Sequence, residues 1–174
     1  NKITPLDGVD PNRNFPEHWG YDDEGSASIT SDQTYRGPGP GSEPETQALT
    51  GLYDRVKFRF HVNYHSFGEL LLYTFGFQVN TPSADDPIYV AWAGTDKKPA
   101  VPGFNPGVGA DLYTTNGEQT DFAAVNEGSL AITPELSSNR GWRKLPVRYA
   151  SSGGFPRQRA CASALGARTP ARTT

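Results

Sequence analysis

Three consecutive polar side chains near the start of the sequence are suited to binding a carboxylate. Arg13 offers a planar fork of N–H donors that matches two carboxylate oxygens, and Asn12 and Asn14 add neutral amide donors on either side. Pro11 fixes its own φ, which favours a loop at this point of the chain. The alternative interpretation is an ordinary ion pair between Arg13 and an acidic side chain of the same protein.

A histidine and a glutamate stand at the ends of two expected strands. Apolar and polar residues alternate over residues 57–65, which predicts a strand that ends at His65. Residues 130–133 are predicted as another strand, which delivers Glu135 just beyond its end. Because ligands gather at the carboxyl ends of strands in open α/β sheets, we expect a site there. Taken alone, each residue is more often structural, as a satisfied histidine or a solvated acid.

The other elements alternate between helices and strands, which indicates an α/β fold. Ser42 and Glu45 form a capping box, so we expect a helix to begin at Ser42. Asp121 is expected to cap a short helix over residues 122–126. Also expected are a long polar loop over residues 17–41, a strand over 69–75 and a short helix over 88–93.

The composition fits a single domain with many loops. The chain has 174 residues, of which 19 are Gly and 15 are Pro. No apolar run approaches the length of a membrane span, so no membrane partner is expected. The sequence begins with Asn1 and contains no Met, so we expect a processed chain or a fragment. Cys161 is the single cysteine, which excludes an intrachain disulfide.

Charge is distributed unevenly along the chain. All 19 acidic residues lie at or before Glu135, where eight Lys and Arg leave a net charge of −11, while the remainder carries +8. Residues 138–174 show no amphipathic period, and we expect them to be disordered or non-native sequence rather than an arm that binds nucleic acid. The acidic body would repel phosphates, so a nucleic-acid partner is disfavoured.

Residues 3–137 resemble the zinc carboxypeptidases of the carboxypeptidase A/T type. Each motif is short, but the order and spacing of four of them agree with the family. They are residues 8–14 (GVDPNRN), residues 35–37 (YRG) with 42–45 (SEPE), residues 64–67 (YHSF) with 70–73 (LLLY), and residues 113–121 (YTTNGEQTD) with 133–136 (TPEL). The resemblance implies an α/β fold with a mixed β-sheet flanked by helices, as part of the zinc-carboxypeptidase fold, over a domain of residues 1–137.

The resemblance also implies roles for individual residues. Glu135 would be the catalytic base, His65 a zinc ligand, and Asp10 an acid that orients a zinc-bound histidine. Asn12 and Arg13 would bind the terminal carboxylate of a peptide, so that peptide and protein C-termini are the expected substrates. The remaining residues with implied substrate contacts are Tyr113, which would close over the terminal residue, and Glu118, Thr120, Asp121 and Thr133, which belong to the specificity pocket.

The sequence departs from the family in its metal ligands. The family's His-x-x-Glu motif precedes the Asn-Arg loop, and it is absent here. One histidine cannot build a tight catalytic zinc site, so we expect zinc in the complete enzyme but weak or absent binding by this chain. The chain alone is expected to be inactive. Thr120 replaces the acid of strictly basic-specific members, and Glu118 still offers a charge, so a mixed apolar and basic preference is expected.

Two alternatives to a carboxypeptidase remain open at this stage. One is a non-catalytic module that keeps the carboxylate clamp and has lost the metal. The other is a relative that cleaves peptidoglycan or removes side-chain amino acids. By resemblance, the complete protein is expected to be a secreted, extracellular monomer.

Overall fold

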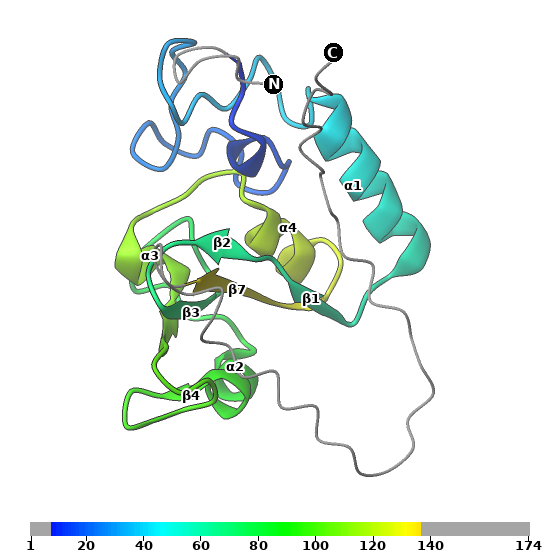
Figure 1. The fold of residues 1–174 in the computed structure, drawn as a ribbon. Coiled ribbons are helices and arrows are strands. Elements are labelled where there is room, and N and C mark those ends of the chain that lie inside the picture. Colours follow the sequence, from blue (N-terminus) through cyan, green and yellow to red (C-terminus); the bar gives the residue numbers. More distant parts are fainter. Residues whose placement is uncertain (1–7, 137–174) are drawn as a thin grey trace, which may run out of the picture. The chain divides into compact units, whose positions relative to one another are not determined.

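The computed structural model describes residues 8–136 of the 174. The chain alternates helices with short strands (Figure 1). The helices are η1 (Pro11–Arg13), α1 (Pro44–Val56), α2 (Asp86–Ala93), α3 (Gly109–Leu112) and α4 (Gln119–Val125). The strands are β1 (Phe60–Val62), β2 (His65–Ser66), β3 (Leu70–Tyr73), β4 (Gly94–Thr95), β5 (Lys98–Pro99), β6 (Asn105–Val108) and β7 (Leu130–Leu136).

One mixed sheet organises the described part of the chain. Its order is β1-β7-β3-β6, and β2 also pairs with β7. β7 runs parallel to β1 and β2 and antiparallel to β3, while β3 runs parallel to β6. Strands β4 and β5 form a separate antiparallel hairpin. The predicted α/β class, with a mixed sheet flanked by helices, is confirmed.

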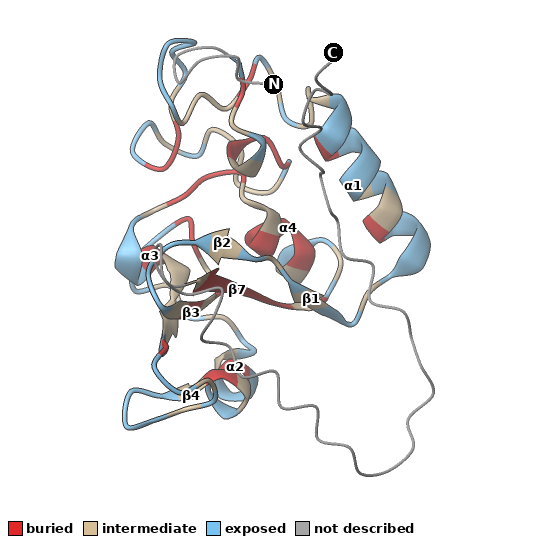
Figure 2. Cartoon of the chain, viewed as in Figure 1, coloured by how far each residue is buried: buried red, intermediate tan, exposed pale blue. Residues whose placement is uncertain are grey.

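Helices cover both faces of this sheet and create two apolar clusters. On the face of α1 and α4, Tyr53 and Phe122 pack with Phe15 and Ala131. On the face of α2, the buried residues are Leu71, Tyr73, Tyr89, Ala93, Phe104 and Ile132. Figure 1 shows α1 and α4 above the sheet and α2 below it. Burial on both faces explains why β7 is buried over most of its length (Figure 2).

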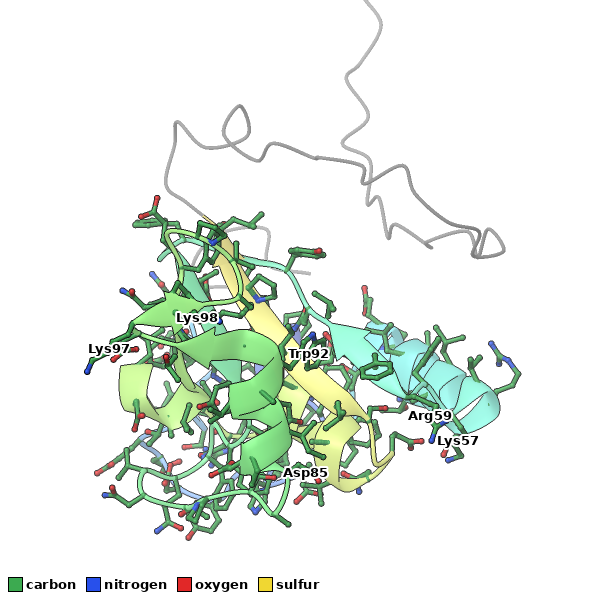
Figure 3. The ribbon with its side chains drawn as sticks, turned by 90° about the horizontal axis from the view of Figure 1, so that it is seen from below. Lys57, Arg59, Asp85, Trp92, Lys97 and Lys98 are labelled. Atoms are coloured by element: carbon green, nitrogen blue, oxygen red, sulfur yellow. The ribbon has the colours of Figure 1, made fainter. Side chains whose placement is uncertain are left out.

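Within the described residues, β1 is an edge strand with β7 as its single partner. Three apolar side chains along this edge, Phe60, Val62 and Tyr64, remain exposed at 62%, 41% and 68%. Phe60 contacts Trp92 of α2 edge-on, with ring centroids 5.6 Å apart. Figure 3 views this side of the sheet from below, with α2 in front and Trp92 labelled. The apolar surface at β1 therefore extends beyond the area that α2 covers.

The predicted capping box at the start of α1 is wrong. The helix begins at Pro44 with Glu43 at the N-cap, and no side chain makes the capping hydrogen bond. The hydroxyl of Ser42 instead accepts from Asn14 Nδ2 at 2.9 Å and donates to Glu43 Oε1 at 2.9 Å. A long-range contact with the loop of Asn14 has displaced the local cap.

The predicted strand over residues 57–65 is shorter and broken. Lys57 adopts a left-handed conformation (φ 52°) that ends α1, and β1 and β2 are separated at Asn63 and Tyr64. The expected capping role of Asp121 is also wrong, because α4 begins two residues earlier with Glu118 at its N-cap. The expected helix at residues 88–93 is confirmed and begins at Asp86.

In the part of the chain that the structure describes, no helix has the length and apolar character needed to cross a bilayer. The expectations for the basic tail, residues 138–174, fall outside the described residues.

Two glycines with similar backbone angles provide a test of how tightly the Arg13 loop packs. Gly117 has φ +67°, and an added Cβ would lie 2.6 Å from the carbonyl oxygen of Arg13. Gly128 has φ +62°, with no atom within 4 Å of the added Cβ. We expect Gly128→Ala to lower the free energy of unfolding by about 1 kcal/mol, from backbone strain alone. Gly117→Ala should lower it by about 3 kcal/mol or more, because a steric clash adds to that strain.

Urea unfolding of the two variants measures this difference. Equal losses for Gly117→Ala and Gly128→Ala would contradict the close approach of residue 117 to the Arg13 loop.

Candidate active site

A cavity opens at the carboxyl ends of β2 and β7, beside η1 and α4. It is lined by Asn12, His65, Leu72, Tyr73, Gly109, Leu112, Tyr113, Thr115, Glu118, Thr120, Thr133 and Glu135. Seven of the ten site residues predicted from the sequence are in this group. The other three, Asp10, Arg13 and Asp121, are not among the lining residues.

Strand pairing places His65 beside Glu135. The parallel register between β2 and β7 aligns the two residues directly, and His65 Nδ1 lies 3.6 Å from Glu135 Oε1. The other ring nitrogen, Nε2, is 2.9 Å from Asn63 Nδ2. Glu135 is buried, with 7% of its surface exposed. A buried carboxylate and an imidazole that face one cavity can exchange protons with a bound molecule.

The amide of Asn12 is oriented by two neighbouring segments. Asp10 Oδ1 accepts the backbone N–H of Asn12 at 3.0 Å and caps η1. Asn12 Oδ1 accepts the backbone N–H of Gln119, at the start of α4, at 3.1 Å. Because its oxygen is engaged in this way, the NH₂ group of Asn12 remains as a donor at the cavity. Asp10 thus acts on the site through the backbone of η1.

Arg13 is buried next to this cavity. Only 6% of its surface is exposed, and its Nη1 donates to the carbonyl oxygen of Asn12 at 2.8 Å. Its Nε is buried and has no hydrogen-bond partner among the described residues. A buried guanidinium with an unsatisfied donor is costly unless an anion approaches it. The alternative interpretation, a structural ion pair of Arg13, finds no acidic partner at ion-pair distance from this side chain within residues 8–136.

The interior of the cavity is polar. Thr120 Oγ1 and Thr133 Oγ1 lie 2.7 Å apart and hydrogen-bond to each other. Thr115 donates its hydroxyl to Glu118 Oε2 at 2.8 Å. Burial raises the pKa of Glu118, although Thr115 and the charge of Arg13 act in the opposite direction. Burial therefore disfavours the charged form of Glu118 within the cavity lining.

Tyr113 and Asp121 occupy contrasting positions. Tyr113 follows α3 in an extended conformation, is 53% exposed and lies at the cavity. Asp121 is 1% exposed and its carboxylate accepts the backbone N–H groups of Gly76 and Phe77. The side chain of Asp121 thus stabilises the loop behind the cavity and does not line it.

Sequence reasoning missed several residues that shape the site. Thr115, Leu72 and Tyr73 line the cavity without having been predicted to do so. Asn14 is fully buried and fixes η1 to the start of α1: its Nδ2 donates to Arg36 O, Gly39 O and Ser42 Oγ, and its Oδ1 accepts from Glu43 N. The available signal was membership of the family motifs, since Asn14 lies in residues 8–14, Leu72 and Tyr73 in residues 70–73, and Thr115 in residues 113–121. The motifs alone assigned no place in the cavity lining to Leu72, Tyr73 or Thr115.

The donor set for a metal is incomplete. Within residues 8–136, no group of three or more His, Cys, Asp or Glu side chains is placed to hold a metal ion. Within residues 8–136, the acidic side chain found within 4 Å of the His65 ring nitrogens is that of Glu135, at 3.6 Å from Nδ1. These residues do not by themselves fit the three-ligand arrangement of a catalytic zinc site.

Comparison with known proteins shows the family. The model of the family described as zinc carboxypeptidase, Peptidase_M14, matches residues 1–149, so this chain belongs to the zinc carboxypeptidases. A metallocarboxypeptidase A-like protein of Trichophyton verrucosum (strain HKI 0517) is 32% identical over 139 residues, covering 74% of this chain and 32% of that protein. Human carboxypeptidase O is 34% identical over 122 residues, covering 67% of this chain and 32% of that protein. The chain spans about a third of the length of these relatives.

Solved structures show the same fold. Carboxypeptidase A from Helicoverpa armigera matches with a TM-score of 0.65 and 24% identity, over 78% of this chain and 34% of that one. Thrombin-activatable fibrinolysis inhibitor matches with a TM-score of 0.64 and 23% identity, over 76% of this chain and 36% of that one. The predicted partial zinc-carboxypeptidase fold is confirmed.

A partly buried histidine, His61, predicts a pH dependence of stability. Tyr53 OH lies 2.6 Å from His61 Nδ1 and accepts from Gln119 Nε2 at 3.1 Å. Burial lowers the pKa of His61 to about 4, from an ordinary value of 6.5. Between these values the unfolded chain binds more protons, so stability is lost as the pH falls from about 6.5 towards 4. His61→Gln removes this contribution.

Between about pH 7.5 and pH 5, we expect the free energy of unfolding of wild type to fall by about 2 kcal/mol more than that of His61→Gln. Urea unfolding at both pH values measures the difference, and a constant cost of the substitution cancels in the comparison. Equal changes in the free energy of unfolding of wild type and His61→Gln would contradict a neutral His61 in the folded state.

Proposed function

We propose that the complete protein that carries this chain is a zinc-dependent metallocarboxypeptidase that removes C-terminal residues from peptides and proteins. The supporting observation is that Asn12, His65 and Glu135 line one cavity, with Arg13 buried beside it. Asn12 and Glu135 lie more than a hundred positions apart in the sequence, and His65 lies between them. Membership of the zinc carboxypeptidase family supports the same assignment. The proposed location of the complete protein is extracellular.

Recognition of the free chain end is assigned to Arg13 and Asn12. A substrate carboxylate would supply the acceptor that Arg13 Nε lacks among the described residues. The NH₂ group of Asn12 would donate to the same carboxylate, since Asn12 Oδ1 is held by Gln119. Tyr113, exposed at the cavity, would close over the terminal side chain. An internal peptide bond offers no such anion, so the enzyme would act at chain ends.

Glu135 is assigned as the general base. Its buried carboxylate would take a proton from the attacking water as the water oxygen bonds to the scissile carbonyl carbon. The same proton would then pass to the leaving nitrogen as the C–N bond breaks. We assign His65 as one zinc ligand; the remaining ligands would come from residues other than those described.

The terminal side chain is assigned to the pocket that contains Glu118, Thr120 and Thr133. The hydroxyl groups of the two threonines satisfy each other, which leaves an uncharged wall suited to apolar side chains. Glu118 adds a carboxyl group that would attract Lys or Arg. A mixed apolar and basic preference follows. Asp121 would support this pocket through Gly76 and Phe77 without touching the substrate.

Removal of the terminal charge tests the proposed clamp. In the complete protein, we expect a C-terminal amide to reduce kcat/KM by a factor on the order of 100 or more relative to the free acid, because a charged hydrogen-bonded pair is lost. Arg13→Lys should weaken cleavage of the free acid, since it removes the two-donor fork. The exposed Arg55→Lys on α1 is the matched control. Equal cleavage of amide and acid would refute the clamp.

A second substitution separates catalysis from binding. Glu135→Gln should lower kcat by roughly 10²- to 10⁴-fold while the affinity for a peptide with a free C-terminus is retained. Glu45→Gln, at an exposed position of α1, is the matched control and should keep its activity. Peptide binding without turnover in the wild-type complete protein would instead favour a non-catalytic binding module.

A further inference from the structure

One buried residue joins the wall of the cavity to the long loop before α1. In the segment between α3 and α4, Thr115 and Glu118 line the cavity, whereas Asn116 is fully buried outside the lining. The backbone N–H of Asn116 donates to the carbonyl oxygen of Gly25 at 3.0 Å. Its Oδ1 accepts the backbone N–H of Asp22 at 3.2 Å. Figure 1 shows this segment reaching up to the loops that precede α1.

The orientation of the Asn116 amide follows from its partners. Asp22 presents an N–H, which requires an acceptor, so the amide oxygen points towards it. The hydroxyl of Ser26 lies 3.4 Å from the same oxygen. Asn116 Nδ2 is buried and has no hydrogen-bond partner among the described residues. Because an unpaired buried amide group costs free energy, the contact through Oδ1 is what favours asparagine at this position.

The turn of residues 22–26 has room for Asn116 because residue 25 is glycine. A Cβ added to Gly25 would lie 2.4 Å from Asn116 Nδ2 and 2.7 Å from its Cγ. Gly25 is not among the glycines with a positive φ, so this close approach, and not the backbone conformation, makes alanine costly here. Asp22 Oδ1 also accepts the backbone N–H of Gly25 at 2.7 Å. The hydrogen bonds and the packing of Asn116 therefore meet on one turn.

Arg36 holds this turn in place. Its Nη1 donates to the carbonyl oxygen of Ser26 at 3.1 Å and to Asp23 Oδ1 at 2.8 Å. Its guanidinium group lies over the ring of Trp19, with Cζ 5.5 Å from the ring centroid. Trp19 Nε1 donates to the carbonyl oxygen of Arg36 at 3.0 Å. Because charged hydrogen bonds are stronger than neutral ones, the turn is a firm support for Asn116.

The neighbours of Asn116 are fastened to other segments. Thr115 N donates to the carbonyl oxygen of Gly76 at 2.8 Å, and Phe15 N donates to that of Gly117 at 2.9 Å. Three consecutive residues thus bond to three different segments. Asn116 is the member of this set whose buried side chain also makes the contact. Loss of that contact would free the turn-facing side of the segment and let the cavity wall move.

We propose that Asn116 is a positioning residue for the pocket that holds the terminal side chain. It fastens the wall of Thr115 and Glu118 to the turn of residues 22–26. The role rests on the proposed carboxypeptidase function, because the group that fills the pocket is the C-terminal side chain of a substrate. Asn116 touches neither the substrate nor the reacting atoms. Its effect therefore falls on substrates whose terminal side chain reaches the pocket wall.

Urea unfolding of the chain tests the packing without any need for catalysis. Gly25→Ala should lower the urea midpoint, because the added methyl group overlaps the amide of Asn116. In Asn116→Ala, which lacks the three atoms nearest to this methyl group, the same substitution should lower the midpoint less. Equal losses in the two backgrounds would overturn the packing of Asn116 on the turn.

A second comparison applies if Asn116→Ala does not fold. Gly51 is exposed on α1, and an added Cβ there meets no atom within 4 Å. Gly25→Ala should lower the urea midpoint, whereas Gly51→Ala should not. A Gly25→Ala variant as stable as the unchanged chain would overturn the packing.

A matched pair of substrates tests the positioning role in the complete protein. Peptides ending in leucine and in alanine share the terminal carboxylate, but the larger leucine side chain extends further into the pocket. The ratio of kcat/KM for leucine over alanine should fall on the order of tenfold in Asn116→Ala, because apolar contacts depend on the fit of the wall. Gly51→Ala is the control and should keep the wild-type ratio. A role in stability alone would reduce the amount of active enzyme and leave the ratio unchanged.

The possible failures can be distinguished. A wild-type ratio in an active Asn116→Ala enzyme would overturn the positioning role and leave the carboxypeptidase assignment in place. If Asn116→Ala does not fold, Gly25→Ala, which displaces the same amide, should lower the ratio, and an unchanged ratio would overturn the role. Absence of turnover with both peptides in the wild-type complete protein would contradict the carboxypeptidase assignment and, with it, a pocket for a terminal side chain.

Discussion

The pairing of β7 with its neighbours is the constraint on which the site depends. β7 is parallel to β2, so His65 and Glu135 are aligned at the same height and face the cavity together. Its antiparallel pairing with β3 aligns Thr133 with Leu72, and both residues line the same cavity. A shift of one residue in β7 would turn Glu135 to the opposite face of the sheet. Burial of β7 on both faces fixes this register.

The loop of Asn12 and Arg13, proposed to bind a carboxylate, is attached to this sheet through α4. Asn12 Oδ1 accepts from the first residue of α4, Gln119, and Phe15 N donates to the carbonyl oxygen of Gly117 at 2.9 Å. The same Gln119 reaches Tyr53 and, through it, His61 on the edge strand. Burial raises the pKa of Tyr53 to about 12, so its hydroxyl group stays protonated in this chain of contacts. The loop proposed to recognise substrate is thus joined to the sheet by backbone and partly buried side-chain hydrogen bonds.

Local patterns predicted the element types well and their ends less well. The expected strand at residues 130–133 is present, although it runs on through Pro134 to Leu136 and is buried over residues 131–135. The capping box at Ser42 failed because the hydroxyl bonds to Asn14, 28 residues away, and no local pattern reveals such a contact. The role of Asp121 was equally hidden, since its partners Gly76 and Phe77 lie in a distant loop. The predicted residues that line the cavity were found through motif order and spacing, whereas Thr115, inside the motif of residues 113–121, was given no role because the motif does not show which of its side chains face the cavity.

In the proposed function, one cleft of the complete protein holds the free end of a peptide at Arg13 and places the adjacent peptide bond at Glu135. A crystal structure of the complete Glu135→Gln protein with a bound peptide tests this claim most directly. We predict that the terminal carboxylate lies within hydrogen-bonding distance of Arg13 and Asn12, with the last peptide carbonyl beside residue 135. A peptide bound with its free carboxylate elsewhere, or with residue 135 distant from the final peptide bond, would contradict the claim.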